Sequence, residues 1–149
     1  MRKSEIITLT DNGETRRFRI TQMPATKAER WINRAMFLLT EASKNVKIPK
    51  RKNDEFKLED AMTLLASVDY EKVEPLYNEL IECCAYLPNG NDVGIQCTQE
   101  TIDAQIEDVM SLYRLRMASA KLNFDFFMNA LQSTPTIKNK ITFTKNTRT

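Results

Sequence analysis

The chain has 149 residues, of which 42% are hydrophobic and 28% are charged, and its three glycines are few for this length. The formal net charge of +2 is too small for a whole-surface attraction to nucleic acid or to a membrane. The sequence contains no histidine, so it lacks both the commonest metal ligand and the side chain that titrates near neutral pH. These features favour one helix-rich domain and exclude much metal and acid–base chemistry.

The cysteines and the first residues indicate a reducing compartment. Cys83, Cys84 and Cys97 are odd in number and none belongs to a C-x-x-C motif, so neither a disulfide framework nor a thiolate metal site is expected. Cys84 is expected to be a small core residue. The stretch MRKSEIITLT lacks the apolar core of a signal peptide, and no stretch approaches 18 uncharged apolar residues. We expect a soluble intracellular protein without cofactor, metal or membrane contact.

The first predicted element is a β-hairpin over residues 5–22. A turn signal at Asp11-Asn12-Gly13 separates two β-rich stretches, the second of which places Phe18 and Ile20 on one face. Two strands alone are marginally stable in water, so this face must pack on the helices or pair with strands of another copy. The exposed edge of the hairpin is therefore a candidate surface for self-association.

Apolar spacing predicts four helices after the hairpin, over about 27–43, 58–68, 73–87 and 101–132. Thr26 to Glu29 fits a capping box for the first helix, whose Trp31 is expected to anchor the hairpin. Pro75 is expected in the first turn of the third helix, because a proline inside a helix costs roughly 3 kcal/mol. The last stretch contains no proline or glycine and would form about 45 Å of helix.

The connecting segments are polar. Lys44 to Lys52 has five basic residues and no acid, which fits either a solvated connector or a patch that binds phosphate or a partner. The loop after residue 88 could include a short strand at 93–97. Residues 133–149 have four basic residues and no acid, which predicts a flexible basic tail.

The predicted fold is therefore α+β and mainly α: an N-terminal β-hairpin, then a four-helix body with a long C-terminal helix. Residues 1–132 are expected to form a single domain.

The candidate binding site is the end of the last predicted helix. Five large apolar residues gather there: Phe124, Phe126, Phe127, Met128 and Leu131. They lie on more than one side of the helix, which indicates either a buried end or a partner-binding surface.

Catalytic patterns are missing from the sequence. It contains no G-x-S-x-G, P-loop or G-x-G-x-x-G motif, and its serines and cysteines have no histidine base. The neighbouring carboxylates Glu107 and Asp108 diverge by about 100° if they lie on a helix, which is typical of a solvated surface. We expect no enzymatic activity and favour a protein that acts through its surfaces.

Three stretches together resemble the tail assembly chaperones of long-tailed bacteriophages and prophages. They are Phe18 to Leu39 (FRITQMPATKAERWINRAMFLL), Val73 to Cys83 (VEPLYNELIEC) and Ile106 to Phe127 (IEDVMSLYRLR and its Leu/Phe-rich continuation). The resemblance implies a chaperone in the host cytoplasm that binds the tape measure protein and keeps it soluble during tail tube assembly. It also implies that the protein is absent from the mature virion, and other tail proteins are further candidate partners. The five apolar residues above would then contact the client.

Two other interpretations remain open. The chain could be a structural tail component, such as a terminator or connector subunit whose hairpin edges close a ring. It could also be a small nucleic-acid-binding regulator that uses Lys44 to Lys52 and the basic tail, although nucleic acid is not the expected partner.

Overall fold

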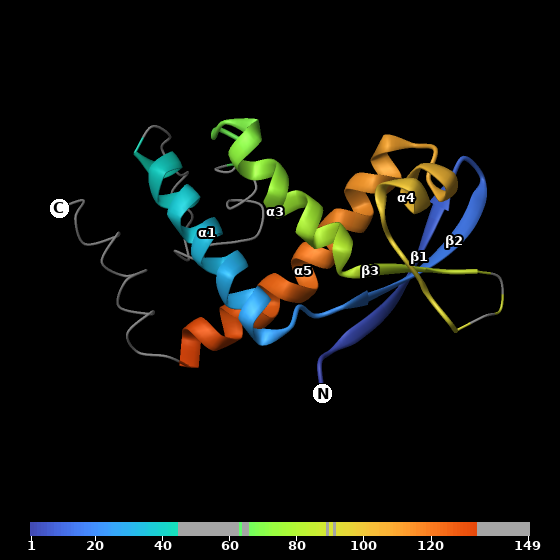
Figure 1. Cartoon of the computed structure of the whole chain (residues 1–149), viewed down its shortest axis with the longest axis horizontal. Coiled ribbons are helices and arrows are strands. Elements are labelled where there is room, and N and C mark those ends of the chain that lie inside the picture. The colour runs from blue at the N-terminus through green and yellow to red at the C-terminus, as the bar shows by residue number, and fades with distance from the viewer. Residues whose placement is uncertain (45–62, 64–65, 89, 91, 134–149) are drawn as a thin grey trace, which may run out of the picture.

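The computed structural model describes residues 1–44, 63, 66–88, 90 and 92–133, without the side chains of 43, 124 and 126–133. The fold is α+β, and a four-stranded antiparallel sheet packs against helices. The helices of the described part are α1 (Ala25–Ser43), α3 (Tyr70–Glu82), α4 (Gln99–Gln105) and α5 (Val109–Ser133). The sheet and α4 lie at one end, α1 and α3 lie at the other, and α5 runs through both (Figure 1).

The predicted N-terminal hairpin is confirmed as β1 (Ser4–Asp11) and β2 (Glu14–Thr21). The two residues between the strands, Asn12 and Gly13, have φ angles of 48° and 83°. Positive φ at both central residues defines a type I′ turn, which fits the right-handed twist of paired strands and suits an Asn-Gly sequence. Phe18 and Ile20 are fully buried against the helices. Of the two arrangements expected for this face, the structure therefore shows packing on the helices of the same chain.

Two further strands complete the sheet in the order β1-β2-β3-β4. β3 (Cys84–Leu87) pairs with β2, and β4 (Ile95–Gln96) lies within the segment where a short strand was expected. The prediction of a helix over 73–87 is therefore wrong at its end, because α3 stops at Glu82. A short apolar run fits a buried strand as well as a helix, and pairing with the free edge of β2 decides between them.

The first helix begins earlier than the capping-box pattern predicts. Its N-cap is Pro24, no side chain caps it, and the N–H of Ala28 bonds to the Pro24 carbonyl at 2.8 Å. A residue that is distant in sequence instead holds the start of this helix: the Asn123 side chain accepts the Met23 N–H at 3.0 Å. This contact ties the strand-to-helix junction to α5.

Two further helix predictions need correction. Pro75 lies inside α3, which begins at Tyr70, and not in its first turn. Proline has no backbone N–H, so α3 lacks the hydrogen bond that this position would make to the carbonyl one turn earlier. The packing of α3 against α1 and α5 offsets the loss of that hydrogen bond. Most of the helix predicted over 58–68 lies outside the described residues, and residues 66–68 form a turn and a bend.

The long helix predicted over 101–132 is two helices, α4 and α5, separated at residues 106–108. Ile106 has extended backbone angles, with φ of −121° and ψ of 121°. Thr98 caps α4 by accepting the Thr101 N–H, and the Asp108 carboxylate accepts the Met110 N–H at 3.0 Å at the start of α5. Aspartate is a strong N-cap residue, so Asp108 favours a new helix start over continuation.

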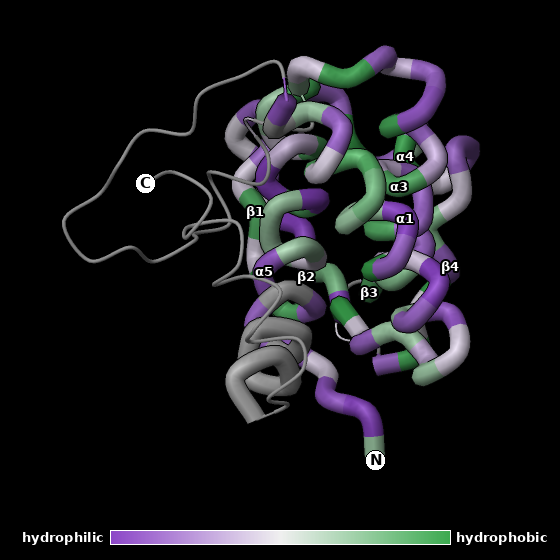
Figure 2. Tube along the Cα trace, turned by 90° about the vertical axis from the view of Figure 1, so that its left-hand side faces the viewer, coloured by the Kyte–Doolittle hydropathy of each residue, from purple (hydrophilic) through white to green (hydrophobic). Residues whose placement is uncertain are grey.

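Among the described residues, two apolar clusters form the core. One joins α1, α3 and α5 and contains Trp31, Leu76 and Ala120, and the other joins the sheet to α4 and α5 around Phe18 and Leu115. Trp31 donates its indole N–H to the Leu76 carbonyl at 3.1 Å, so it anchors α1 to α3 rather than to the hairpin. Hydrophilic and hydrophobic residues alternate along the helices, as expected for amphipathic elements with one buried face (Figure 2).

Several predicted segments fall outside this description. Residues 45–52 of the basic loop and residues 134–149 of the basic tail lie outside the described residues. The single domain over 1–132 stays a prediction.

Candidate functional site

Two tyrosines and an arginine gather where α3 meets α5. The guanidinium carbon of Arg116 lies 5.2 Å from the centre of the Tyr77 ring and 5.9 Å from that of Tyr113. Tyr77 comes from α3, whereas Tyr113 and Arg116 are one turn apart on α5, where residues three positions apart are neighbours. A cation over an aromatic face is attracted by the ring quadrupole. We call these three residues the tyrosine–arginine cluster.

The positive charge of this cluster has no acidic partner in the part of the chain that the structure describes. Among the described residues Arg116 forms no ion pair, and its Nε is buried without a hydrogen-bond acceptor. Burial raises the pKa of the Tyr77 hydroxyl, and the nearby Arg116 charge partly opposes that rise. Tyr77 is therefore neutral at physiological pH and does not balance the guanidinium charge. A buried polar atom without an acceptor, such as this Nε, has an energetic cost.

Large apolar and aromatic side chains are exposed on the two helices that carry the cluster. Tyr70, Val109, Met110 and Tyr113 expose 65%, 56%, 49% and 50% of their surface. Tyr70 precedes Tyr77 by two helical turns, and both Tyr70 and Tyr113 influence the pKa of Tyr77 electrostatically. Tyrosine, methionine and arginine are enriched at the centres of protein interfaces.

Buried hydrogen bonds hold this seam in place. The Ser119 hydroxyl donates to the Leu80 carbonyl of α3 at 2.6 Å, and the Asn123 amide donates to the sulfur of Cys83, at the end of α3, at 3.9 Å. Both side chains are small and almost fully buried, so they allow α5 to approach α3 closely. The cluster therefore lies on two helices that are packed closely against each other.

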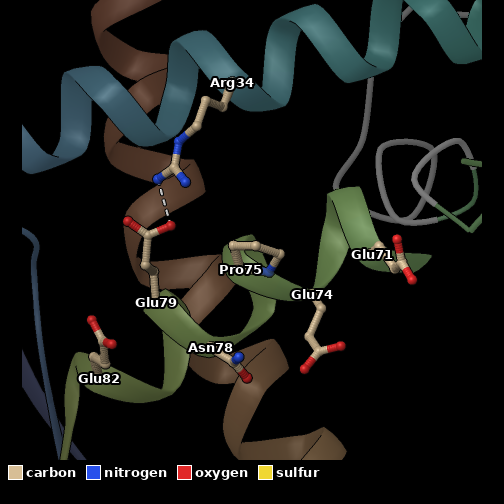
Figure 3. A pocket seen from close by; sticks show the side chains of 7 residues that line it. All are labelled: Arg34, Glu71, Glu74, Pro75, Asn78, Glu79 and Glu82. Atoms are coloured by element: carbon tan, nitrogen blue, oxygen red, sulfur yellow. Dashed lines mark hydrogen bonds and ion pairs between the residues drawn. The ribbon is translucent and has the colours of Figure 1, made fainter. Parts of the chain in front are cut away.

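An open pocket of about 520 Å³ lies between α1 and α3. Its lining is mainly acidic and consists of Arg34, Glu71, Glu74, Pro75, Asn78, Glu79 and Glu82. Figure 3 shows Arg34 reaching from α1 to pair with the Glu79 carboxylate, and Lys27 of α1 pairs with Glu82 at 2.8 Å. These two ion pairs join α1 to α3.

The residues predicted from the sequence to bind a partner occupy the final turns of α5. The helical backbone at Phe124, Phe126, Phe127, Met128 and Leu131 agrees with the predicted helix. The side chains of all five lie outside the described residues, so the structure does not add contacts to that prediction. The tyrosine–arginine cluster was not predicted, because no sequence signal pairs α3 with α5. From the sequence alone, only the three-residue spacing of Tyr113 and Arg116 could be recognised.

The cysteines form no disulfide and behave as core residues. Cys84 and Cys97 are buried and Cys83 is half-buried, which confirms the prediction for Cys84. Burial raises the pKa of all three thiols, and for Cys97 it does so to about 11. Within the described ranges no group of three metal-ligating side chains occurs. No helix in that part of the chain has the length and apolar character needed to cross a membrane.

Comparison with models of known protein families identifies the family to which the chain belongs. The family model of the phage tail assembly chaperone protein, TAC, matches residues 12–135. The match covers most of the chain, so the protein belongs to the phage tail assembly chaperone family, a family of chaperones and not a known class of enzymes. Comparisons with curated proteins and with solved structures gave no match.

Proposed function

We propose that this chaperone binds the tape measure protein of its phage and keeps it soluble in the host cytoplasm while the tail tube assembles around it. The family match over residues 12–135 is the observation that carries the proposal. The protein has no catalytic task in this account, and it leaves before the tail is complete. Other tail proteins are further candidate partners.

The physical need for such a chaperone follows from the client. A long helical chain with apolar stripes aggregates at cellular concentrations unless those stripes are covered. A groove between amphipathic helices can cover an apolar helix reversibly. In this account Phe124, Phe126, Phe127, Met128 and Leu131 of α5 supply one apolar contact with the client.

Several copies acting along one client also form part of the proposal. The outer edge of β1 pairs with no other strand in the part of the chain that the structure describes. An unpaired edge offers backbone groups to a strand of another copy. Sedimentation of the purified protein at several concentrations would measure this self-association, and a monomer at every concentration would remove it from the proposal.

Co-expression with the tape measure protein from the same genome tests the main claim. We expect the client to stay soluble and to co-purify, and we expect Phe124→Asp with Phe127→Asp to reduce both. Circular dichroism of the variant must match the wild type. Insoluble client in the presence of the wild-type protein would contradict the proposal.

Mass spectrometry of purified particles separates this function from the alternative of a structural tail component. A chaperone is absent from finished tails, whereas a terminator or connector subunit is present in fixed copy number.

A further inference from the structure

We infer that the tyrosine–arginine cluster, together with the exposed side chains of Tyr70, Val109 and Met110, is a docking site for an amphipathic helix. This helix carries a carboxylate among apolar side chains. The inference rests on the proposed function, because the helix belongs to the tape measure protein. It adds a second contact to the one proposed at the end of α5, and it specifies the chemistry of the client segment.

The carboxylate follows from the state of Arg116. Its guanidinium contacts two aromatic rings but has no ion pair among the described residues, and its Nε lacks an acceptor. Arginine presents its N–H groups in a planar fork that matches the two oxygens of a carboxylate. The Nε atom is buried, so a client aspartate or glutamate would reach the guanidinium through its other N–H groups. It would there compensate a positive charge that has no ion pair among the described residues.

The apolar part of the partner follows from the surroundings. Tyr70 on α3 and Val109 and Met110 on α5 expose 65%, 56% and 49% of their surface, and they lie on the two helices that carry the cluster. Methionine adapts its shape to different apolar partners, which suits a client with many similar segments. Tyrosine buries a large area with few rotatable bonds, so little conformational entropy is lost on binding.

The client residue that faces Arg116 has to be acidic, because the guanidinium charge has no ion pair among the described residues. A basic client residue at that position would be repelled by the guanidinium, whereas an acidic one would be attracted to it. Helix-in-groove binding reads apolar anchors at three- and four-residue spacing, so an acidic residue between two such anchors can reach Arg116.

The test uses the full chain and overlapping peptides of about 25 residues that span the tape measure protein. Binding is measured by fluorescence anisotropy for the wild type, Arg116→Gln and Tyr113→Ala. Arg114→Gln is the matched control, because it removes the same charge two residues earlier on α5. We expect Arg116→Gln to weaken binding about tenfold and Arg114→Gln to weaken it less than about twofold.

The sharper readout is a double-substitution cycle. Replacing the acidic residue of a binding peptide by its amide should weaken the binding of that peptide to the wild type. The same replacement should not change the affinity of the peptide for the Arg116→Gln variant. Independent losses would overturn the inference, as would tight binding of peptides that contain no acid. Tyr113→Ala truncates an exposed residue, so it should keep the fold while it weakens binding.

The remaining outcomes are also informative. If no peptide binds the wild type, the docking site is wrong, while the proposed function still stands or fails on co-purification of the full-length client. If Arg116→Gln alters sedimentation of the protein alone and leaves peptide binding unchanged, the surface belongs to a second copy and the inference fails.

Discussion

The carboxylate of Asp11 accepts the backbone N–H of Asp108 at 2.9 Å, across 97 positions of the chain. Its other oxygen accepts the Glu107 N–H at 2.8 Å. The last residue of β1 therefore binds the amides just before α5, where the positive end of a helix favours an anion. Asn12 adds a bond to the Glu107 carboxylate at 2.9 Å. The hairpin tip and the start of α5 are consequently one unit.

The first prediction concerns pH. The Glu107 and Asp108 amides hold the pKa of Asp11 below its ordinary value of 3.8. A carboxyl with a lowered pKa in the folded state stabilises the protein fully above its unfolded pKa, and that stabilisation is lost as pH falls through the folded pKa. We expect the melting temperature to fall below pH 4, and Asp11→Asn to lower it at pH 7.

The control for this prediction is Asp103→Asn, which changes an exposed carboxyl on α4. It should leave the acid profile almost unchanged. An Asp11→Asn protein with the wild-type melting temperature at pH 7 would show that the contact contributes no stability.

The second prediction concerns the buried amide at the strand-to-helix junction. Asn123→Ala removes the acceptor of the Met23 N–H, and both residues are almost fully buried. A buried donor without an acceptor costs about 1–3 kcal/mol in the free energy of unfolding. Urea denaturation measures the loss, and Asp125→Ala at an exposed position of α5 is the control. Equal stability of the two variants would contradict a stabilising role for this hydrogen bond.

The third prediction concerns a close approach within the sheet. A Cβ added at Gly94 would lie 2.8 Å from the Cβ of Ala85. We expect Gly94→Ala to destabilise the protein by about 1–3 kcal/mol, as overpacking does. Adding Ala85→Gly to the same protein removes the clash, so its added cost should be smaller than that of Ala85→Gly alone. Additive losses in thermal unfolding would contradict the close contact.

The fourth prediction concerns the thiols. With a pKa of about 11, roughly one Cys97 side chain in a thousand is a thiolate at pH 8. Burial raises the pKa of Cys84 and Cys83 as well. A thiol reagent such as dithionitrobenzoate should therefore label the native protein slowly and the urea-unfolded protein fast. Rapid labelling of one native cysteine would place that thiol at the surface.

The elements that could be predicted from the sequence are those specified by local signals. Asn12-Gly13 predicts the hairpin because the turn requires positive φ at both positions, and the apolar stripe around Trp31 predicts α1. The strand β3 was missed because its four residues fit two periodicities, and only the edge of β2 decides between them. The break before α5 depends partly on Asp11, which no local pattern connects to Glu107.

The two proposed binding surfaces could be predicted from the sequence only in part. The aromatic end of α5 was visible as composition, since its apolar residues are close in sequence. The tyrosine–arginine cluster joins Tyr77 to Arg116 across 39 positions, and only the packing of α3 on α5 brings them together. Short side chains such as Ser119 permit that packing, but a single sequence does not reveal which helix they face.

The central claim is that this protein keeps the tape measure protein soluble, and a dilution experiment tests it most directly. Denatured tape measure protein is diluted into buffer with increasing amounts of this chaperone, and light scattering records aggregation. We predict that scattering falls to baseline at a fixed stoichiometric ratio and that a soluble complex elutes as one species. Scattering that is unchanged by excess chaperone, while an unrelated chaperone suppresses it, would contradict the account.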